Sequence, residues 1–315
     1  MKLIIQIPCF NEEATLETTF NDLPKHIDGI DEIEYLIIND GSTDNTVNVA
    51  KSLGINHIVS FKQNKGLAKG FMAGLDACLH LGADIIVNTD ADNQYCGEDI
   101  AKLVRPILIG EADIVIGERP IDQMKNFSRV KKRFQHFGSW VVRIASGTAV
   151  SDAASGFRAY SREAALLLNV TNEFTYTHET IIQAGHNKIA MAYVPVRVND
   201  VNRPSRLSGS MGKYIRRSAS VIIRSYLKYK PLRFFSLLGS LLLLTGAGFF
   251  VFSVNDSGNG HIHFIILSVV FLILGFQSIL IGFLADTAAS DRKILEDIQY
   301  RIREMNCREE KDDHT

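Results

Sequence analysis

The sequence predicts an α/β protein: a Rossmann-like, mostly parallel sheet with helices on both faces, followed by a C-terminal hairpin of two transmembrane helices. Three observations predict this fold class. Residues 1–117 alternate short apolar segments with helical patterns, the order typical of an open parallel sheet. The apolar segments end in polar turns rich in Asp, Asn and Gly. Two uncharged segments near the C-terminus are each long enough to cross a bilayer.

The individual elements follow from the spacing of apolar residues. Short apolar segments predict strands over residues 3–7, 35–38, 57–61, 85–88 and 114–116. Helical patterns lie between them, over residues 12–23, 44–53 and 66–81, and Asp44 is the expected cap of the second. After residue 117 the pattern loosens, and we expect a helix ending near Leu168 and a strand over residues 189–196.

Polar sequences follow each of the predicted strands. In an open parallel sheet, ligands bind outside the carboxyl ends of the strands. The sequences at those ends are PCFNEE, NDGSTD, QNKG, TDADNQ and GER. We therefore expect these loops to face one crevice, which is the predicted ligand site.

The TDADNQ turn carries the strongest metal-binding signal. Asp90 and Asp92 follow a buried strand with one small residue between them, and Gln94 adds a neutral oxygen. Paired carboxylates of this kind can hold Mg²⁺ or Mn²⁺ from one side, which leaves the other positions for water and phosphate oxygens. The alternative is that these side chains only cap the next helix.

Other polar residues at the strand ends have two interpretations each. Asp40 can accept hydrogen bonds from a base or ribose, or it can be the turn aspartate of DGST. Glu12 can contact a ligand or stabilise the first turn of a helix. Arg119 can pair with phosphate through both ends of its guanidinium group. Arg158 can do the same, or it can hold a structural carboxylate such as Asp152.

Several classes of site are not indicated. The chain has no Walker A sequence and no GxGxxG after the first strand. Its four cysteines are scattered, which fits a reducing compartment without a zinc site. The net charge of −1 identifies no partner, and we expect no nucleic-acid ligand. A strand pattern starts at Lys2, so we expect no signal peptide.

Positive charge is concentrated before the C-terminal segments. Residues 203–233 contain nine Lys or Arg and no acidic residue, and residues 119–147 contain seven against one Asp. Residues 129–143 mix these cations with aromatic residues at helical spacing. Residues 213–232 have a similar pattern, and we expect both to be amphipathic helices at a membrane surface.

The two long apolar segments, residues 234–254 and 262–285, predict a transmembrane hairpin. Lys and Arg precede the first span and follow the second, whereas the short linker between the spans has neither. The positive-inside rule then places both termini in the cytoplasm. The expected domains are residues 1–212 as a cytosolic catalytic domain, 213–232 as an interfacial helix, 233–286 as the hairpin, and 287–315 as a cytosolic helix and tail.

Taken together, the motifs resemble those of glycosyltransferase family 2. The resemblance is carried by IPCFNEE, NDGSTD, KGLAKG, TDADNQ, SGFR and the two C-terminal spans. The closer likeness is to the membrane-anchored polyprenyl-phosphate sugar transferases of the dolichol-phosphate mannose synthase group. It runs from the first strand through Arg206 and resumes in the hairpin. It implies a GT-A fold and inverting transfer of a sugar from a UDP- or GDP-linked donor to a polyprenyl phosphate.

The resemblance also implies roles for the residues at matching positions. Nucleotide-sugar contacts are implied for Pro8, Phe10, Glu12, Asp40, Thr89, Asp90, Ala91, Arg203 and Arg206. Metal ligands are implied at Asp90, Asp92 and Gln94, and catalytic roles at Asp92, Arg119, Arg158 and Glu179. Two departures from the family pattern stand out. Phe10 replaces the usual Tyr of the first loop, and RPSRLSGS replaces the commoner RxxGxSK, which leaves open whether Arg203, Arg206 or Lys213 contacts phosphate.

Three other functions remain open from the sequence. A processive polysaccharide synthase is disfavoured because the QxxRW motif of those enzymes is absent. Transfer to a protein or glycan acceptor would need a general base, for which Asp152 or Glu179 is available. A non-catalytic membrane subunit would use the small residues of GSLLLLTGAG to pack helices. Association of several copies of the chain also stays open.

Overall fold

The computed structural model describes residues 1–315 except 125–126, 172–174, 200–210, 256–260 and 314–315. The chain forms two compact units. The first contains Met1–Ile222 together with Tyr300–Thr315, and the second contains Ile223–Gln299.

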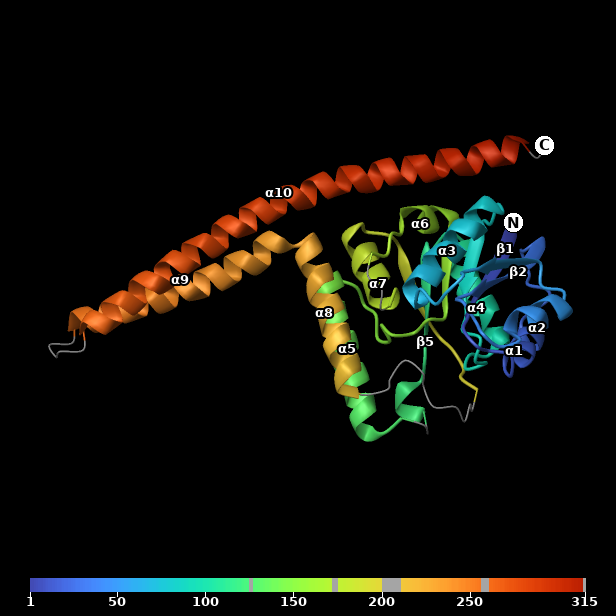
Figure 1. Ribbon diagram of the computed structural model, residues 1–315, viewed down its shortest axis with the longest axis horizontal. Coiled ribbons are helices and arrows are strands. Elements are labelled where there is room, and N and C mark those ends of the chain that lie inside the picture. Colours follow the sequence, from blue (N-terminus) through green and yellow to red (C-terminus); the bar gives the residue numbers. More distant parts are fainter. Residues whose placement is uncertain (125–126, 172–174, 200–210, 256–260, 314–315) are drawn as a thin grey trace. The chain divides into compact units, whose positions relative to one another are not determined.

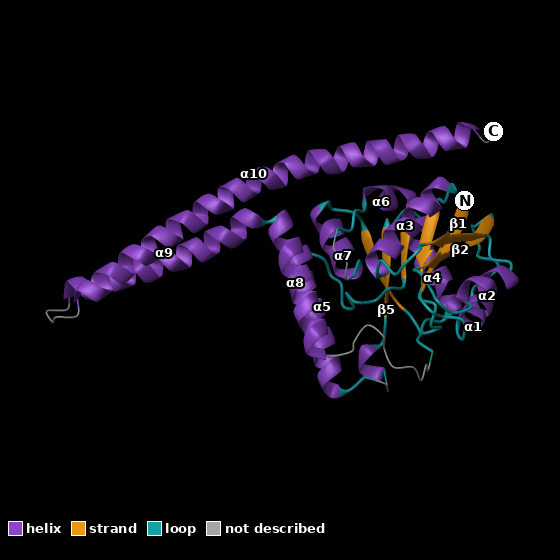
Figure 2. Ribbon diagram, in the orientation of Figure 1, coloured by secondary structure: helices purple, strands orange, loops and turns teal. Residues whose placement is uncertain are grey.

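The first unit is built on the sheet that Figures 1 and 2 draw as arrows. This sheet has seven strands in the order β3-β2-β1-β4-β6-β5-β7. Its strands are β1 (Lys2–Cys9), β2 (Glu32–Asn39), β3 (His57–Ser60), β4 (Ile85–Asn88), β5 (Ile114–Glu118), β6 (Arg158–Ser161) and β7 (Met191–Pro195). Only β6 runs antiparallel to its neighbours, β4 and β5, in this sheet. The predicted α/β class and mostly parallel sheet are therefore confirmed.

Helices cover both faces of this sheet. Besides the end of α10, the first unit contains the helices α1 (Leu16–Asp22), α2 (Thr46–Ser52), α3 (Leu67–His80), α4 (Ile100–Leu108), α5 (Arg129–Ser146), α6 (Arg162–Leu167), α7 (Thr177–His186) and the first part of α8 (Met211–Tyr229). Leu3 and Ile5 point to the same core as Leu103 of α4. Gln6, of opposite parity on β1, faces α3, where a Cβ added to Gly74 would lie 2.3 Å from Gln6 Oε1.

Two helices begin later than the sequence predicts. The helix expected from residue 12 begins at Leu16, because the backbone N–H and the carboxylate of Glu13 are instead hydrogen-bonded to the loop after β2. The helix expected from Asp44 begins at Thr46. Asp44 still caps it in effect, since its carboxylate accepts a hydrogen bond from the Thr46 backbone N–H at 3.1 Å.

Strand β6 was not predicted from the sequence. It lies between β4 and β5, and all four of its residues are buried, including Arg158 and Ser161. Because polar residues interrupt this strand, it has no continuous apolar segment from which a strand could be predicted. They are tolerated because they are hydrogen-bonded: Ser161 Oγ, for example, donates to Asp113 Oδ1 at 3.0 Å.

The second unit consists of the end of α8, helix α9 (Pro231–Asn255) and most of α10 (His261–Asp313). Pro231–Asn255 and Ile262–Cys307 are long and apolar enough to cross a membrane, with mean hydropathies of 2.1 and 2.7 over their most apolar segments. The predicted spans lie inside these helices. Helix α10 has no break near residue 286, so the second predicted span and the helix expected within residues 287–315 form one continuous helix.

Small residues let α9 and α10 pack closely within the second unit. A Cβ added to Gly275 of α10 would lie 2.9 Å from the Gly239 carbonyl oxygen of α9. Ser268 Oγ of α10 donates to the Gly246 carbonyl oxygen at 2.7 Å. Close backbone approach of this kind is how apolar helices associate where lipid removes the hydrophobic driving force.

The end of α10 belongs to the first unit and is anchored there by Arg303. Its guanidinium group pairs with Asp76 of α3 at 3.0 Å. It also donates to the carbonyl oxygens of Leu166 and Leu168, at 3.4 and 2.8 Å. A cation at the last carbonyls of α6 satisfies groups that the helix itself leaves unpaired.

Candidate active site

The loops after β1 and β2 are joined by reciprocal hydrogen bonds at the carboxyl edge of the sheet. The Asn11 N–H donates to Ser42 Oγ at 3.0 Å, and Asn11 Oδ1 accepts from the Thr43 N–H at 2.8 Å. The Glu13 N–H donates to Asp44, and Glu13 Oε2 accepts from the Asn45 N–H at 2.8 Å. These bonds make one rigid rim from the two loops that carry Phe10 and Asp40.

Asn11 holds this rim in an unusual backbone conformation. Its φ of 55° lies in the left-handed region, which Asn tolerates better than most residues with a Cβ. Asn11 was not among the site residues predicted from the sequence. Its signal in the sequence is weak, because an Asn after a strand is common in any turn.

Phe10, Glu12 and Asp40 occupy different positions on this rim. Phe10 is exposed and presents an aromatic face at the end of β1, after Pro8 on the strand itself. Glu12 Oε2 accepts from Thr15 Oγ1 at 2.8 Å. Asp40 is buried, and its two carboxylate oxygens accept from the Lys65 and Gly66 N–H groups at 2.6 and 2.9 Å.

Asp40 therefore holds the turn before α3, as the turn interpretation predicts. Gly41 beside it must be glycine: its φ is 71°, and a Cβ there would lie 2.5 Å from the Gln63 carbonyl carbon. A carboxylate oxygen has more than one lone pair, so each oxygen of Asp40 can still accept a bond from a ligand. Both interpretations of Asp40 remain compatible with this geometry.

The TDAD turn continues directly from β4. The Thr89 N–H still donates to the Gln6 carbonyl oxygen at 3.1 Å, which extends the strand pairing to the residue before Asp90. The Ala91 carbonyl oxygen accepts from Thr19 Oγ1 of α1 at 2.9 Å. Asp92 Oδ1 accepts from the Gln94 N–H at 3.0 Å, which closes the turn. The turn is thus fixed from both sides, and its two carboxylates interact.

The electrostatics of this turn favour a cation. Burial, together with the charge of Asp92, raises the pKa of Asp90 to about 7. Two interacting carboxylates in a poorly solvated position repel each other, and a bound cation would relieve that repulsion. Among the described residues no group of three or more His, Cys, Asp or Glu side chains gathers into a metal site. Asp90 and Asp92 therefore fit a metal that also takes oxygens from water and from a phosphate ligand.

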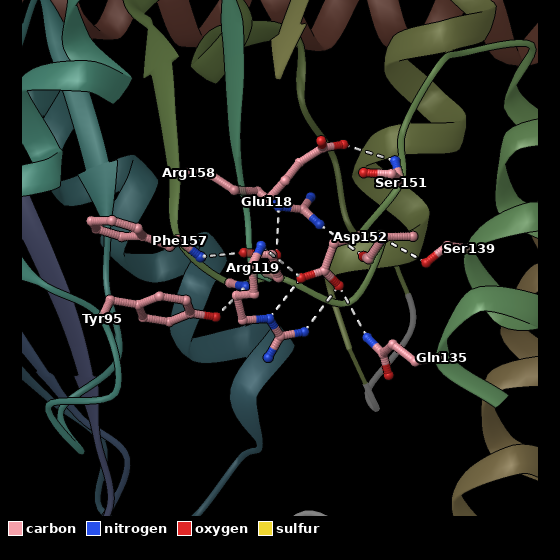
Figure 3. A network of polar contacts seen from close by, with 12 residues as sticks. Tyr95, Glu118, Arg119, Gln135, Ser139, Ser151, Asp152, Phe157 and Arg158 are labelled. Atoms are coloured by element: carbon pink, nitrogen blue, oxygen red, sulfur yellow. Dashed lines mark hydrogen bonds and ion pairs between the residues drawn. The ribbon is translucent and has the colours of Figure 1, made fainter. Parts of the chain in front are cut away.

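Arg119, at the end of β5, is held by Asp152 in a bidentate ion pair (Figure 3). Its Nε and Nη2 lie 2.6 and 3.0 Å from the two carboxylate oxygens. Burial alone would raise the pKa of Asp152, but the charge and hydrogen bonds of Arg119 hold it below its usual value. Gln135 of α5 donates to Asp152 Oδ1 at 3.0 Å and completes the network. The Arg119 charge also acts on Asp90 and opposes the rise in its pKa.

Arg158 does not hold Asp152, so that predicted pairing is wrong. Its side chain is fully buried and donates to the carbonyl oxygens of Ala153, Ser155 and Thr177, and to Thr180 Oγ1. These bonds commit its Nε, Nη1 and Nη2 to the protein. The geometry therefore gives Arg158 a structural role in joining β6 to α7, and it does not support a contact with phosphate.

Glu179 of α7 is buried and accepts from the Thr171 N–H and Oγ1, at 3.2 and 2.8 Å. Arg203 and Arg206 lie outside the described residues, as does the side chain of Lys213. The structure thus brings Phe10, Asp40, Asp90, Asp92 and Arg119 to the carboxyl edge of the sheet, on the loops after β1, β2, β4 and β5.

Comparison with known proteins identifies the family of this chain. The family model described as Glycosyl transferase family 2 matches residues 4–167, the segment that carries β1 to α6. The chain belongs to glycosyltransferase family 2. A relative from Methanococcus voltae, named UDP-N-acetylglucosamine–dolichyl-phosphate N-acetylglucosaminyltransferase, is 32% identical over 213 residues, which cover 61% of this chain and 83% of the relative.

One further relative and one crystal structure are also similar to this family 2 chain. The undecaprenyl-phosphate mannosyltransferase of Micrococcus luteus is 30% identical over 166 residues, covering 51% of this chain and 66% of the relative. The crystal structure of glucosyl-3-phosphoglycerate synthase from Mycobacterium tuberculosis with Mn²⁺, UDP and phosphoglyceric acid matches with a TM-score of 0.57 and 21% identity. It covers 71% of this chain and 78% of that chain, and it shows that the fold is of the GT-A type.

Proposed function

We propose that this protein transfers a sugar from a nucleoside-diphosphate sugar to a polyprenyl phosphate, with inversion, at the cytoplasmic face of a membrane. The observation that carries the proposal is that Asp90, Asp92 and Arg119 lie at one edge of a family 2 fold, where Asp152 holds Arg119 in place. The relatives named for dolichyl-phosphate and undecaprenyl-phosphate transfer support the lipid acceptor. The two apolar helices support a location at the membrane.

The donor would bind along the carboxyl edge of β1, β2 and β4. Phe10 offers an aromatic face on which a base can stack, and Asp40 has lone pairs for a base or ribose. A divalent cation, Mg²⁺ or Mn²⁺, held by Asp90, Asp92 and Gln94 would supply positive charge to the diphosphate. Arg119 adds a fixed positive charge beside it, oriented by its ion pair and therefore needing little reorganisation during the reaction.

The acceptor phosphate would act as its own nucleophile. Its second pKa is near about 6, so at neutral pH it is largely ionised and needs no general base. A phosphate oxygen would form a bond to the anomeric carbon while the bond from that carbon to the diphosphate breaks. The nucleoside diphosphate leaves with the electron pair, and no proton is transferred. This agrees with Asp152, which is already committed to Arg119.

Helix α5 supports a membrane-surface location for the site. Its buried residues are Ser139, Val142, Ala145 and Ser146. Its exposed large apolar residues are Val130, Phe134, Phe137, Trp140 and Ile144. A helix with one face on the protein and an exposed aromatic stripe among cations suits the boundary between headgroups and acyl chains.

The experiment that tests the function uses membranes containing the full chain. They are incubated with radiolabelled UDP- and GDP-sugars and with undecaprenyl or dolichyl phosphate, and then extracted with organic solvent. We expect label in the organic phase for one donor, and none with Asp92→Asn. Label that stays in the aqueous phase for every donor and both lipids would overturn the lipid acceptor.

A further inference from the structure

The peptide groups on either side of Gly156 are held by side chains from three separate elements. The Gly156 N–H donates to Tyr95 Oη at 3.2 Å. The Gly156 carbonyl oxygen accepts from Asn88 Nδ2 at 2.9 Å and from Tyr176 Oη at 3.2 Å. Asn88 ends β4, Tyr95 follows the TDADNQ turn, and Tyr176 is the N-cap residue of α7. Side chains therefore fix the segment just before β6.

Gly156 lies directly against the carboxylate of Asp90. A Cβ added to Gly156 would lie 3.3 and 3.4 Å from the two carboxylate oxygens of Asp90, and 2.9 Å from Tyr176 Oη. Such distances are tighter than ordinary van der Waals contact, so any side chain at this position would have to displace one of these groups. The backbone of Gly156 thus packs directly against one side of the Asp90 carboxylate.

The side chains that hold the Gly156 backbone are themselves fixed by other contacts. Asn88 is fully buried, and its Oδ1 accepts from Gln6 Nε2 on the adjacent strand at 2.9 Å. The Tyr176 ring stacks on Phe71 of α3, with centroids 3.9 Å apart and an angle of 4° between the planes. A buried polar chain whose bonds are satisfied favours one arrangement over alternatives. The sequence offers one signal for it, an Asn in an otherwise apolar strand.

We propose that Asn88, Tyr95 and Tyr176 are positioning residues that act through Gly156 to fix the Asp90 carboxylate for cation binding. The inference rests on the proposed function, since it takes Asp90 as a ligand of the divalent cation. Positioning of this kind is worth about 10- to 100-fold in metal affinity when the partners of metal ligands are removed. A purely structural role would lower stability and leave metal affinity unchanged.

The test is a Mn²⁺ titration of the full chain in detergent, with and without UDP, followed by electron paramagnetic resonance. Tyr176→Phe keeps the stacking on Phe71 and removes the hydroxyl, and Gly156→Ala adds the obstructing methyl group. We expect both to bind Mn²⁺ about tenfold more weakly than wild type. Tyr160→Phe is the matched control, because Tyr160 is also buried against Phe71 but does not contribute to the described bonds of Gly156.

The outcomes separate the inference from the proposed function. In a turnover assay, the variants should lower kcat and leave the KM for the lipid acceptor unchanged. Wild-type Mn²⁺ affinity in both variants would overturn the inference and leave the function standing. Failure of the wild type to bind Mn²⁺ in either condition would overturn the metal assignment and the inference together. If Tyr176→Phe does not fold, Tyr95→Phe removes a hydroxyl from the other side of Gly156 and is judged by the same outcomes.

Discussion

Arg119 and the buried Asp152 form a largely buried bidentate ion pair, with Nε and Nη2 of the arginine 2.6 and 3.0 Å from the two carboxylate oxygens. They are 33 residues apart in the chain, on the segments that follow β5 and precede β6. The pair fixes the direction in which a positive charge faces the edge of the sheet. Its integrity is therefore expected to matter for both stability and turnover.

Asp152→Asn should destabilise the protein by about 3 to 5 kcal/mol, because it leaves the largely buried Arg119 charge without its counter-charge. It should also lower kcat, since Arg119 loses its fixed orientation. Thermal unfolding and the lipid-extraction assay measure the two effects. The control is Asp122→Asn, which breaks an exposed pair with His136 and should cost about 0 to 1 kcal/mol. Equal stability of the two variants would contradict the prediction.

Removal of the Asn11 side chain should weaken nucleotide binding. Asn11→Gly keeps the left-handed backbone accessible and deletes the oxygen that accepts from the Thr43 N–H. Loss of one such bond is worth about 1 kcal/mol, or about a fivefold rise in Kd. Isothermal titration with UDP and GDP measures it. Asn48→Ala, an exposed substitution on α2, should leave both Kd values unchanged, and an unchanged Kd in Asn11→Gly would refute the role of the joined loops.

Stability should fall at acid pH because of His178. Burial, followed by the charge of Arg158, lowers the pKa of His178 from 6.5 to about 4. Between these values the unfolded chain binds a proton that the folded chain does not. The contribution of His178 to the free energy of unfolding is therefore fully present above about pH 6.5. It is lost as the pH falls towards 4, by about 3 kcal/mol in total.

Thermal unfolding of wild type and His178→Gln between pH 7.5 and 4.5 tests this dependence. Other groups titrate over the same range in both proteins, so the difference between the two curves isolates His178. We expect the loss of stability on acidification to be smaller in the variant. Parallel curves would show that His178 is not buried in the neutral form.

Close packing of the hairpin should make Gly275 sensitive to a single methyl group. A Cβ there would lie 2.8 Å from Leu243 Cγ and 2.9 Å from the Gly239 carbonyl oxygen. Gly275→Ala should therefore destabilise the hairpin by about 1 to 3 kcal/mol. Gly248→Ala is the control, because a Cβ there meets nothing within 4 Å. Titration with SDS in mixed micelles, followed by circular dichroism, should unfold Gly275→Ala first; coincident curves would count against this packing.

Much of the fold could be predicted from the sequence because local patterns encode it. The parallel strands were visible as apolar segments and the spans as long uncharged ones. Strand β6 was not visible, because Arg158 and Ser161 are polar and only their distant partners make their burial possible. The continuity of α10 was also missed, since a change from apolar to charged composition does not by itself end a helix.

The site was predictable as a set of loops and less so as a set of contacts. Asp90, Asp92 and Arg119 follow strand ends, and the topology of an open sheet brings such ends together. The partners of Arg119 and Arg158 were assigned wrongly or not at all. An ion pair between residues far apart in the chain has no periodic signal, and a buried arginine and a phosphate-binding arginine look the same in a sequence.

The reversed direction of β6 has a consequence for how this enzyme can be altered. The chain leaves β1, β2 and β4 at the edge where the donor is proposed to bind, whereas it enters β6 at that same edge. The sheet thus has two parts. The first contains β1 to β4, within residues 1–88, and the second contains β5, β6 and β7 and joins the first through the pairing of β4 with β6. A chimaera joined near residue 112 would take the loops after β1, β2 and β4 from one parent, and we expect it to inherit the nucleotide preference of that parent.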